Sequence, residues 1–336
     1  MKYRSLFSLF IGAATVAMLA ASVSAEHEVD TIVSGLTNPS GVSFGQNGQM
    51  AVGDARGKVV VVRDGKSSDY LVDFATEHWK KDDDGNKWYK VGPLSTLWLG
   101  DTLVVADSGR EDGLESIKFF NNSGSAVDGS GTNSIGPTNE KDEKDKGEGN
   151  LTGMCLSNGR DKIYVCGQGY DSKTWVLGVD IATMKLETLF SADDNGIETN
   201  SPMQAVMKSD GKLLVLYSGK GGAADGLVVE WDVIEKKPTK QWKLPGLVNP
   251  MGMAKISDDR FAIVENNWDL KSVKDGRVAI VTLGEGDAAE VEPLDGVSLK
   301  GPVSCAFGPD GRLYVSQLGE KFDGEEGSVV AISGVK

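Results

Sequence analysis

Asp54, Asp107, Glu265 and Gln317 stand at one shared position of a repeated pattern and are the first residues of this chain that suggest chemistry. Carboxylates that meet at one rim can bind a divalent cation or act as general acid and base. The same side chains can instead be structural, since a carboxylate satisfies the backbone N–H groups of a nearby loop. The structural interpretation is favoured, and a rim of such groups stays open as a site.

Aromatic residues in two long connections form a second candidate. Trp79, Trp88 and Tyr89 surround a polar stretch within residues 75–92, and Trp268 lies in another connection, residues 266–275. Aromatic rings beside a polar turn can form a lid or a wall on which a ligand stacks. They can equally pack the loop onto the fold. We expect a ligand site from these aromatics together with the four rim residues.

Metal and cofactor signals are sparse. Asp82, Asp84 and Asn86 place oxygen side chains at alternate positions around Gly85, as calcium loops do, but the distal Glu of an EF-hand is missing. An ordinary acidic turn is therefore favoured, with calcium as the alternative. The chain has two histidines, and it contains neither a Cys-x-x-Cys-His haem motif nor a Gly-x-Ser-x-Gly elbow. No cofactor is firmly implied, and an Asp/Glu-based hydrolase stays open.

Six repeats must position these residues. Each combines a lead-in, a short apolar strand, a tight turn and a second apolar strand, and the repeats start near residues 39, 93, 152, 202, 250 and 302. A repeat of about 50 residues that supplies four strands predicts an all-β, six-bladed β-propeller with four-stranded blades. The last repeat has only three strands, and residues 28–34 are expected to supply its outer strand and close the ring. A linear solenoid needs no such closure and is disfavoured.

The long connections predict which face holds a site. Links from second to third strands and from blade to blade are long, whereas the other turns are short. In a propeller both long classes emerge on one face, so we expect the site there. The segment 121–149 is rich in polar and charged residues and is expected to be a solvated loop.

The motif Pro-x-Gly-x-x-Phe-Gly-x-Asn/Asp-Gly-x-Leu/Met-Tyr/Ala-Val is clearest at residues 39–52 and 302–315, where Ser304 replaces the first glycine of the second copy. This motif resembles those of the NHL and SMP-30/gluconolactonase-like propellers. The gluconolactonase resemblance implies a divalent cation held by Glu, Asn and Asp at the top of the channel. None of the corresponding positions in this chain is a carboxylate or an amide: Ser40, Leu94, Thr152, Met203, Met251 and Val303. The resemblance therefore extends to the scaffold, and that lactonase chemistry is disfavoured. Quinoprotein sugar dehydrogenases resemble the chain in architecture alone.

Residues 1–25 have the pattern of a signal peptide, with Lys2 and Arg4, an apolar stretch and a small-residue cleavage site after Ala25. A retained N-terminal helix is the disfavoured alternative. We expect residues 26–336 to form a single exported domain, periplasmic, cell-surface or extracellular, without a membrane span.

The net charge of −14 argues against nucleic acid as a partner. Cys155, Cys166 and Cys305 are expected to be buried apolar residues, with a Cys155–Cys166 bridge as the alternative. The favoured function is a monomeric propeller that binds a small molecule, glycan or protein on its loop-rich face. The alternative is a divalent-cation-dependent hydrolase or lactonase with a rebuilt site.

Overall fold

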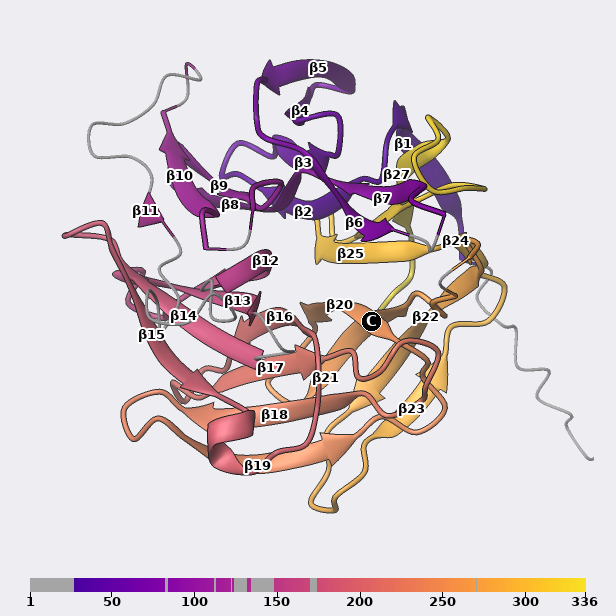
Figure 1. Cartoon of the computed structure of the whole chain (residues 1–336). Coiled ribbons are helices and arrows are strands. Elements are labelled where there is room, and N and C mark those ends of the chain that lie inside the picture. Colours follow the sequence, from indigo (N-terminus) through magenta and orange to yellow (C-terminus); the bar gives the residue numbers. More distant parts are fainter. Residues whose placement is uncertain are drawn as a thin grey trace, which may run out of the picture.

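The computed structural model describes residues 27–81, 84–111, 113–121, 123, 132–133, 148–169, 174–269 and 271–336. Six sheets are arranged radially around a central channel, with the first strand of each repeat innermost (Figure 1). The predicted all-β, six-bladed propeller is confirmed. The predicted signal peptide lies outside the described residues. No helix long and apolar enough to cross a bilayer occurs within the described part of the chain.

The first three blades run outward in chain order. The first blade consists of β2 (Ser40–Phe44), β3 (Met50–Asp54), β4 (Lys58–Arg63) and β5 (Lys66–Leu71). The second consists of β8 (Pro93–Leu99), β9 (Thr102–Asp107), β10 (Ser116–Phe120) and β11 (Thr132–Asn133). The third consists of β12 (Glu148–Leu156), β13 (Lys162–Gly169), β14 (Thr174–Asp180) and β15 (Lys185–Ser191). A short 3-10 helix, η2 (Asp193–Asn195), follows β15.

The next two blades have the same order. The fourth blade consists of β16 (Pro202–Met207), β17 (Leu213–Tyr217), β18 (Leu227–Asp232) and β19 (Lys237–Lys243). The fifth consists of β20 (Pro250–Lys255), β21 (Arg260–Glu265), β22 (Asp275–Thr282) and β23 (Glu290–Pro293), and β24 (Leu299–Lys300) also pairs with β22. Because the outer strands face solvent, their sequences are polar and do not show where each strand begins and ends. In the first blade, the outer strand β5 begins at the polar residue Lys66, directly after the Asp64-Gly65 turn.

Both ends of the described chain complete the sixth blade. β25 (Pro302–Phe307), β26 (Leu313–Gln317) and β27 (Gly327–Ile332) are followed outward by β1 (Val29–Leu36), which pairs antiparallel with β27 from Val29–Ile332 to Leu36–Gly327. The predicted N-terminal outer strand is confirmed. The ring closes without leaving the edge of β27 unpaired.

Glycines let the inner strands approach one another around the channel. A Cβ on Gly41 would lie 2.5 Å from Ser95 Cα, and a Cβ on Gly153 would lie 2.3 Å from Met203 O. A Cβ on Gly252 would lie 2.9 Å from Ser304 Cα. Alternate blades thus carry glycine where the next blade carries a larger residue, and the inner strands pack with almost no space between their backbones.

Apolar side chains fill the spaces between blades. Phe190 of the third blade stacks on Trp231 of the fourth, with ring centroids 4.4 Å apart. Cys166 lies in the same cluster, and Cys155 packs against it. Both thiols are free, so the alternative of a Cys155–Cys166 bridge is wrong. In the register, Cys166 pairs with Gly153 and Cys155 pairs with Tyr164, which leaves the two cysteines on non-paired positions.

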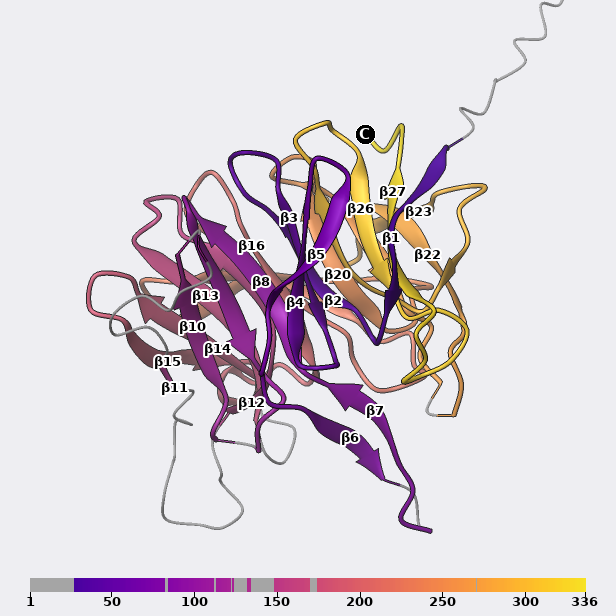
Figure 2. The ribbon, with the colours of Figure 1, turned by 90° about the horizontal axis from the view of Figure 1, so that it is seen from above.

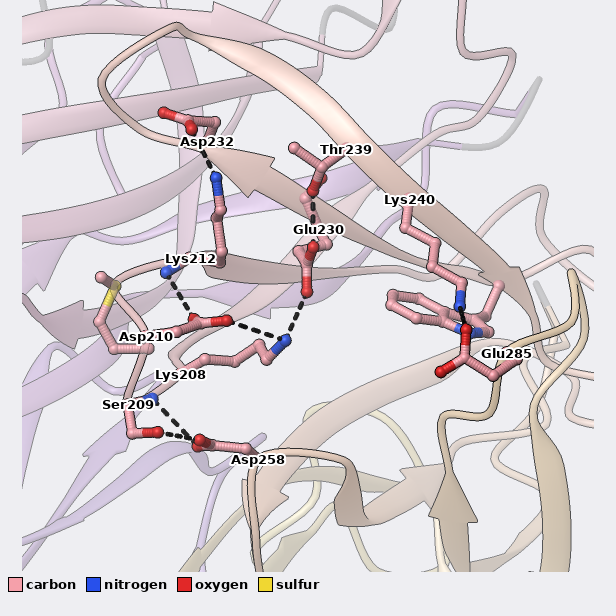
Figure 3. Close-up of polar contacts among 12 residues, drawn as sticks. Lys208, Ser209, Asp210, Lys212, Glu230, Asp232, Thr239, Lys240, Asp258 and Glu285 are labelled. Carbon is pink, nitrogen blue, oxygen red and sulfur yellow. Dashed lines mark hydrogen bonds and ion pairs between the residues drawn. The ribbon is translucent and has the colours of Figure 1, made fainter.

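Polar contacts tie the short turns of the fourth and fifth blades together (Figure 3). Asp258 accepts hydrogen bonds from the backbone and hydroxyl of Ser209, and Lys208 pairs with Glu230 at 2.6 Å. Lys212 pairs with Asp232 at the end of β18. The Ser209 turn follows the far end of β16, opposite the end where the pocket described below is found.

Candidate functional site

A pocket of about 420 Å³ opens at the end of the channel where the inner strands begin. All six positions that the sequence placed around the channel mouth lie in its lining: Ser40, Leu94, Thr152, Met203, Met251 and Val303. A second cavity of about 340 Å³ lies at the other end of the inner strands. Gly41, Gln204 and Ser304 line both cavities and therefore lie between them along the channel.

Uncharged polar groups make up much of the pocket lining. Five amide side chains contribute, together with serine and threonine hydroxyls: Asn150, Gln168, Asn200, Gln204 and Asn249. Amides offer both donors and acceptors, so a ring of them can pair with ligand hydroxyl groups in either sense. The polar lining therefore suits a neutral ligand that is rich in hydroxyl groups.

Several of these side chains are held in place by the loops around them. Asn249 accepts a hydrogen bond from Gly222 N at 2.7 Å and donates to Lys220 O at 2.9 Å. Asn200 accepts from Ser201 N at 2.7 Å and from Gln168 Nε2 at 3.3 Å. Fixed donors and acceptors lose little conformational entropy when a ligand binds.

A two-stranded hairpin supplies the other wall of the pocket. Residues 75–92 form β6 (Glu77–Lys81) and β7 (Lys87–Val91), which project from the pocket end of the ring (Figure 2). This segment was predicted to be a connection between blades, and its two strands were not predicted. The hairpin is fixed at its base because Asp323 accepts hydrogen bonds from Lys90 N at 2.6 Å and Asn38 Nδ2 at 2.7 Å.

Three aromatic side chains, Trp79, Tyr89 and Trp268, line the pocket and are called the aromatic wall below. Their ring centroids lie 5.0–5.8 Å apart, from two connections that are distant in sequence. Trp79 is 38% exposed, whereas Tyr89 and Trp268 are each 8% exposed. Burial, reinforced by the charge of Asp323, raises the pKa of Tyr89. Within the aromatic wall, the Trp79 indole is therefore accessible to a ligand, and it packs on the buried rings of Tyr89 and Trp268.

Trp88 and Phe322 back the aromatic wall. Phe322 contacts Tyr89 at 5.2 Å and Trp268 at 5.5 Å between ring centroids, and Trp88 packs on Phe322 at 5.5 Å. Neither side chain is part of the pocket lining. The structure therefore brings all four predicted aromatics into one cluster, in which Trp88 supports the wall from behind.

Lys80 is the charged residue in the described pocket lining. Its Nζ lies 3.5 Å from the centroid of the Trp79 ring, within the range of a cation–π contact. Burial lowers the pKa of Lys80. It makes no ion pair with another described residue.

The predicted rim residues lie outside the pocket lining and pair with neighbouring residues of the ring. Asp54 pairs with Arg56 at 2.6 Å, and Asp107 pairs with Arg110 and Lys118, each at 2.7 Å. Glu265 pairs with Arg277 and accepts from Val248 N at 2.6 Å. Gln317 accepts from Lys300 N at 2.8 Å and donates to Ser328 Oγ at 3.0 Å. The structure does not bring these four residues together with the aromatic wall.

The calcium motif lies at the tip of the hairpin. Asp82 is outside the described residues, Asp84 is exposed, and Asn86 comes just before β7. No group of three or more His, Cys, Asp or Glu side chains is placed to hold a metal ion within the described part of the chain. Calcium binding by Asp82, Asp84 and Asn86 stays a prediction.

The amides, Lys80 and Phe322 were not predicted from the sequence. One signal for the amides was present, because an asparagine recurs one or two residues before the repeat starts at 152, 202 and 250, namely Asn150, Asn200 and Asn249. Its structural counterpart Asn38 instead donates to Lys90 O and fixes the hairpin. Phe322 had no such signal, because its role depends on a contact between two loops.

Comparisons with known proteins show the fold. No family model matches the chain, and no curated protein matches it significantly. Among solved structures, a glucose dehydrogenase is 13% identical over 92% of this chain and 100% of its own, with a TM-score of 0.57. The soluble aldose sugar dehydrogenase of Escherichia coli is 13% identical over 91% and 99%, with a TM-score of 0.56.

A gluconolactonase from Xanthomonas campestris is 12% identical over 92% of this chain and 89% of its own, with a TM-score of 0.57. These likenesses support the fold-level resemblance to gluconolactonase-like propellers. The resemblance to NHL propellers in particular stays a prediction.

Proposed function

We propose that this protein acts on a small compound of the sugar class, held in the pocket at the channel mouth. The observation that carries the proposal is the aromatic wall facing a ring of fixed amides and hydroxyls. A sugar ring has apolar C–H faces that pack on an indole, and its hydroxyls pair with groups that both donate and accept. The printed names of the structural neighbours, which concern glucose, aldoses and gluconolactone, support the same substrate class.

Binding is tested by calorimetry with a panel of aldoses and sugar lactones. Trp79→Ala is expected to weaken binding of the best panel member by about 1–2 kcal/mol, because the exposed indole of the wall is lost. Trp88→Ala is the matched control, since it comes from the same hairpin but lies outside the lining. Equal losses in the two variants, or no binding by any panel member, would contradict the proposal.

The neighbours favour an enzyme over a protein that only binds, so a second candidate is a divalent-cation-dependent lactonase. The described lining supplies neither carboxylate nor imidazole. Its cation would therefore have to be held by other residues. Turnover of glucono-lactone, measured with and without added Ca²⁺, Mg²⁺ or Zn²⁺, separates the candidates. Metal-dependent turnover that Trp79→Ala abolishes supports the enzyme, and binding without turnover supports the binding protein.

We further propose that the chain is exported as a monomer after cleavage at Ala25. The proposal rests on the N-terminal pattern and on the pairing of β1 with β27, which covers the edge of β27 and closes the ring. N-terminal sequencing of the mature protein and sedimentation analysis test it. A chain that keeps its first residues, or a stable dimer, would contradict it.

A further inference from the structure

We propose that Lys80 binds an anionic group of the ligand, so that the preferred ligand is a sugar acid with one carboxylate. This inference rests on the proposed function, and it narrows the substrate class from sugars in general to uronic or aldonic acids. The carrying observation is a single cation set among uncharged groups in the described pocket lining.

The position of Lys80 leaves its charge available to a ligand. The side chain is half-buried in the pocket wall, and its ammonium group lies over the Trp79 ring at 3.5 Å. No described residue forms an ion pair with it. Removing an ammonium group from water costs free energy that an aromatic face offsets only in part. A ligand carboxylate would supply the missing counter-charge.

The acidic groups nearest to the pocket are occupied elsewhere. Asp323 accepts from Lys90 N and Asn38, and Asp269 pairs with Lys274 at 3.0 Å. Asp225 accepts from the backbone of Lys220 at 3.0 Å. None of these carboxylates pairs with Lys80. Lys80 is therefore the cation of the described lining that is available to a ligand carboxylate.

The chemistry of the site favours a carboxylate over a phosphate. Phosphate sites combine several charged or backbone donors, commonly an arginine fork or a helix N-terminus. The described lining holds one lysine, which acts as a single point charge, beside five neutral amides. One negative charge on a hydroxyl-rich ring matches that set of groups.

Two pairs of sugars test the inference, because each pair differs only at C6: D-glucuronate against D-glucose, and D-galacturonate against D-galactose. At about 50 mM salt, where screening is weak, we expect the acid to bind about tenfold more tightly in at least one pair. Lys80→Gln should remove this preference and leave the affinity for the neutral sugar within about threefold, whereas Lys80→Arg should retain most of it. Lys87→Gln is the control, since Lys87 is exposed on the same hairpin and lies outside the lining.

The outcomes separate the two proposals. Equal affinity for acid and neutral sugar, or a preference that survives Lys80→Gln, overturns the role of Lys80 and leaves the sugar site intact. Failure of a folded protein to bind any acidic or neutral sugar overturns the proposed function and this inference with it. An acid preference lost only in Lys80→Gln supports both.

Discussion

Gly153 shows how closely the inner strands approach at the scale of single atoms. A Cβ there would lie 2.3 Å from Met203 O, a distance that real Cβ atoms essentially never show, and the obstacle is backbone. The neighbouring blade can make room for a methyl group only by moving its inner strand. Because that strand packs on further inner strands, the displacement would be passed to other blades of the ring.

Gly153→Ala is expected to destabilise the protein by at least about 2–3 kcal/mol, because overpacking forces the backbone to move. Gly284→Ala is the control, since a Cβ there has open space and its backbone is not left-handed. Urea unfolding of both variants measures the difference. Equal midpoints would contradict the close packing of the inner strands.

The buried carboxylate of Asp54 has a structural explanation that can be tested. Its side chain is fully buried, pairs with Arg56 and accepts from Arg56 N at 2.8 Å. Asp54→Ala should cost about 2–3 kcal/mol of stability, because buried donors lose their acceptor. Sugar binding should stay unchanged, since Asp54 lies outside the pocket lining. Calorimetry measures the binding and urea unfolding measures the stability. Loss of binding with unchanged stability would show that Asp54 contributes to the ligand site.

Among the secondary-structure elements, the hairpin β6–β7 contributes to the candidate site more than to the propeller scaffold. It is a separate two-stranded sheet, and it contributes Trp79, Lys80 and Tyr89 to the pocket. Its contacts with the ring are concentrated in the aromatic cluster and at Asp323. The six blades do not need it for their strand pairing.

Replacing residues 78–90 with a short Gly-Ser linker should abolish sugar binding and leave the propeller folded. We expect a fall in the melting temperature of a few degrees, because Trp268 and Phe322 lose aromatic contacts of about 0.5–1.5 kcal/mol each. Circular dichroism reports the fold and calorimetry the binding. Retained affinity would exclude the hairpin from the site, and loss of cooperative unfolding would show it to be part of the scaffold.

The six repeats and their apolar strands could be predicted from the sequence because burial imposes apolar residues on these strands, as in β4, β14 and β27. The strands of the hairpin could not be predicted. Glu77–Lys81 is mostly charged and polar, so neither strand shows the alternation that marks a half-buried sheet. The aromatic cluster could be suspected from its composition, but its partners Phe322 and Trp268 meet only through the closed ring.

Many exposed aspartates of the whole molecule have lowered pKa values. Backbone hydrogen bonds and Lys212 lower the pKa of Asp232 to about 2, and contacts with Lys255 and Ser209 lower that of Asp258 further. A carboxylate with a lowered folded-state pKa stabilises the fold above its unfolded pKa and loses that contribution as the pH falls through the folded value. The network of Figure 3 is thus expected to be intact at neutral pH.

The melting temperature should therefore fall progressively from about pH 4 towards pH 2. Asp258→Asn should shift this acid transition and leave the neutral-pH stability changed by less than about 1 kcal/mol, as for an exposed pair. Thermal melts across this pH range, in low and high salt, measure the effect. An unchanged melting temperature down to pH 2 would show that these contacts contribute nothing.

The pairing of β1 with β27 also sets the order in which the fold can be completed. The ribosome makes Val29 among the first residues of the ring and Ile332 among the last, yet these two residues pair in the same sheet. While the chain is being made, β1 has no native partner, and the sixth blade cannot form. Closure must therefore wait until β27 has been made, and the pairing that completes the ring joins residues about 300 positions apart, a long-range contact that forms slowly.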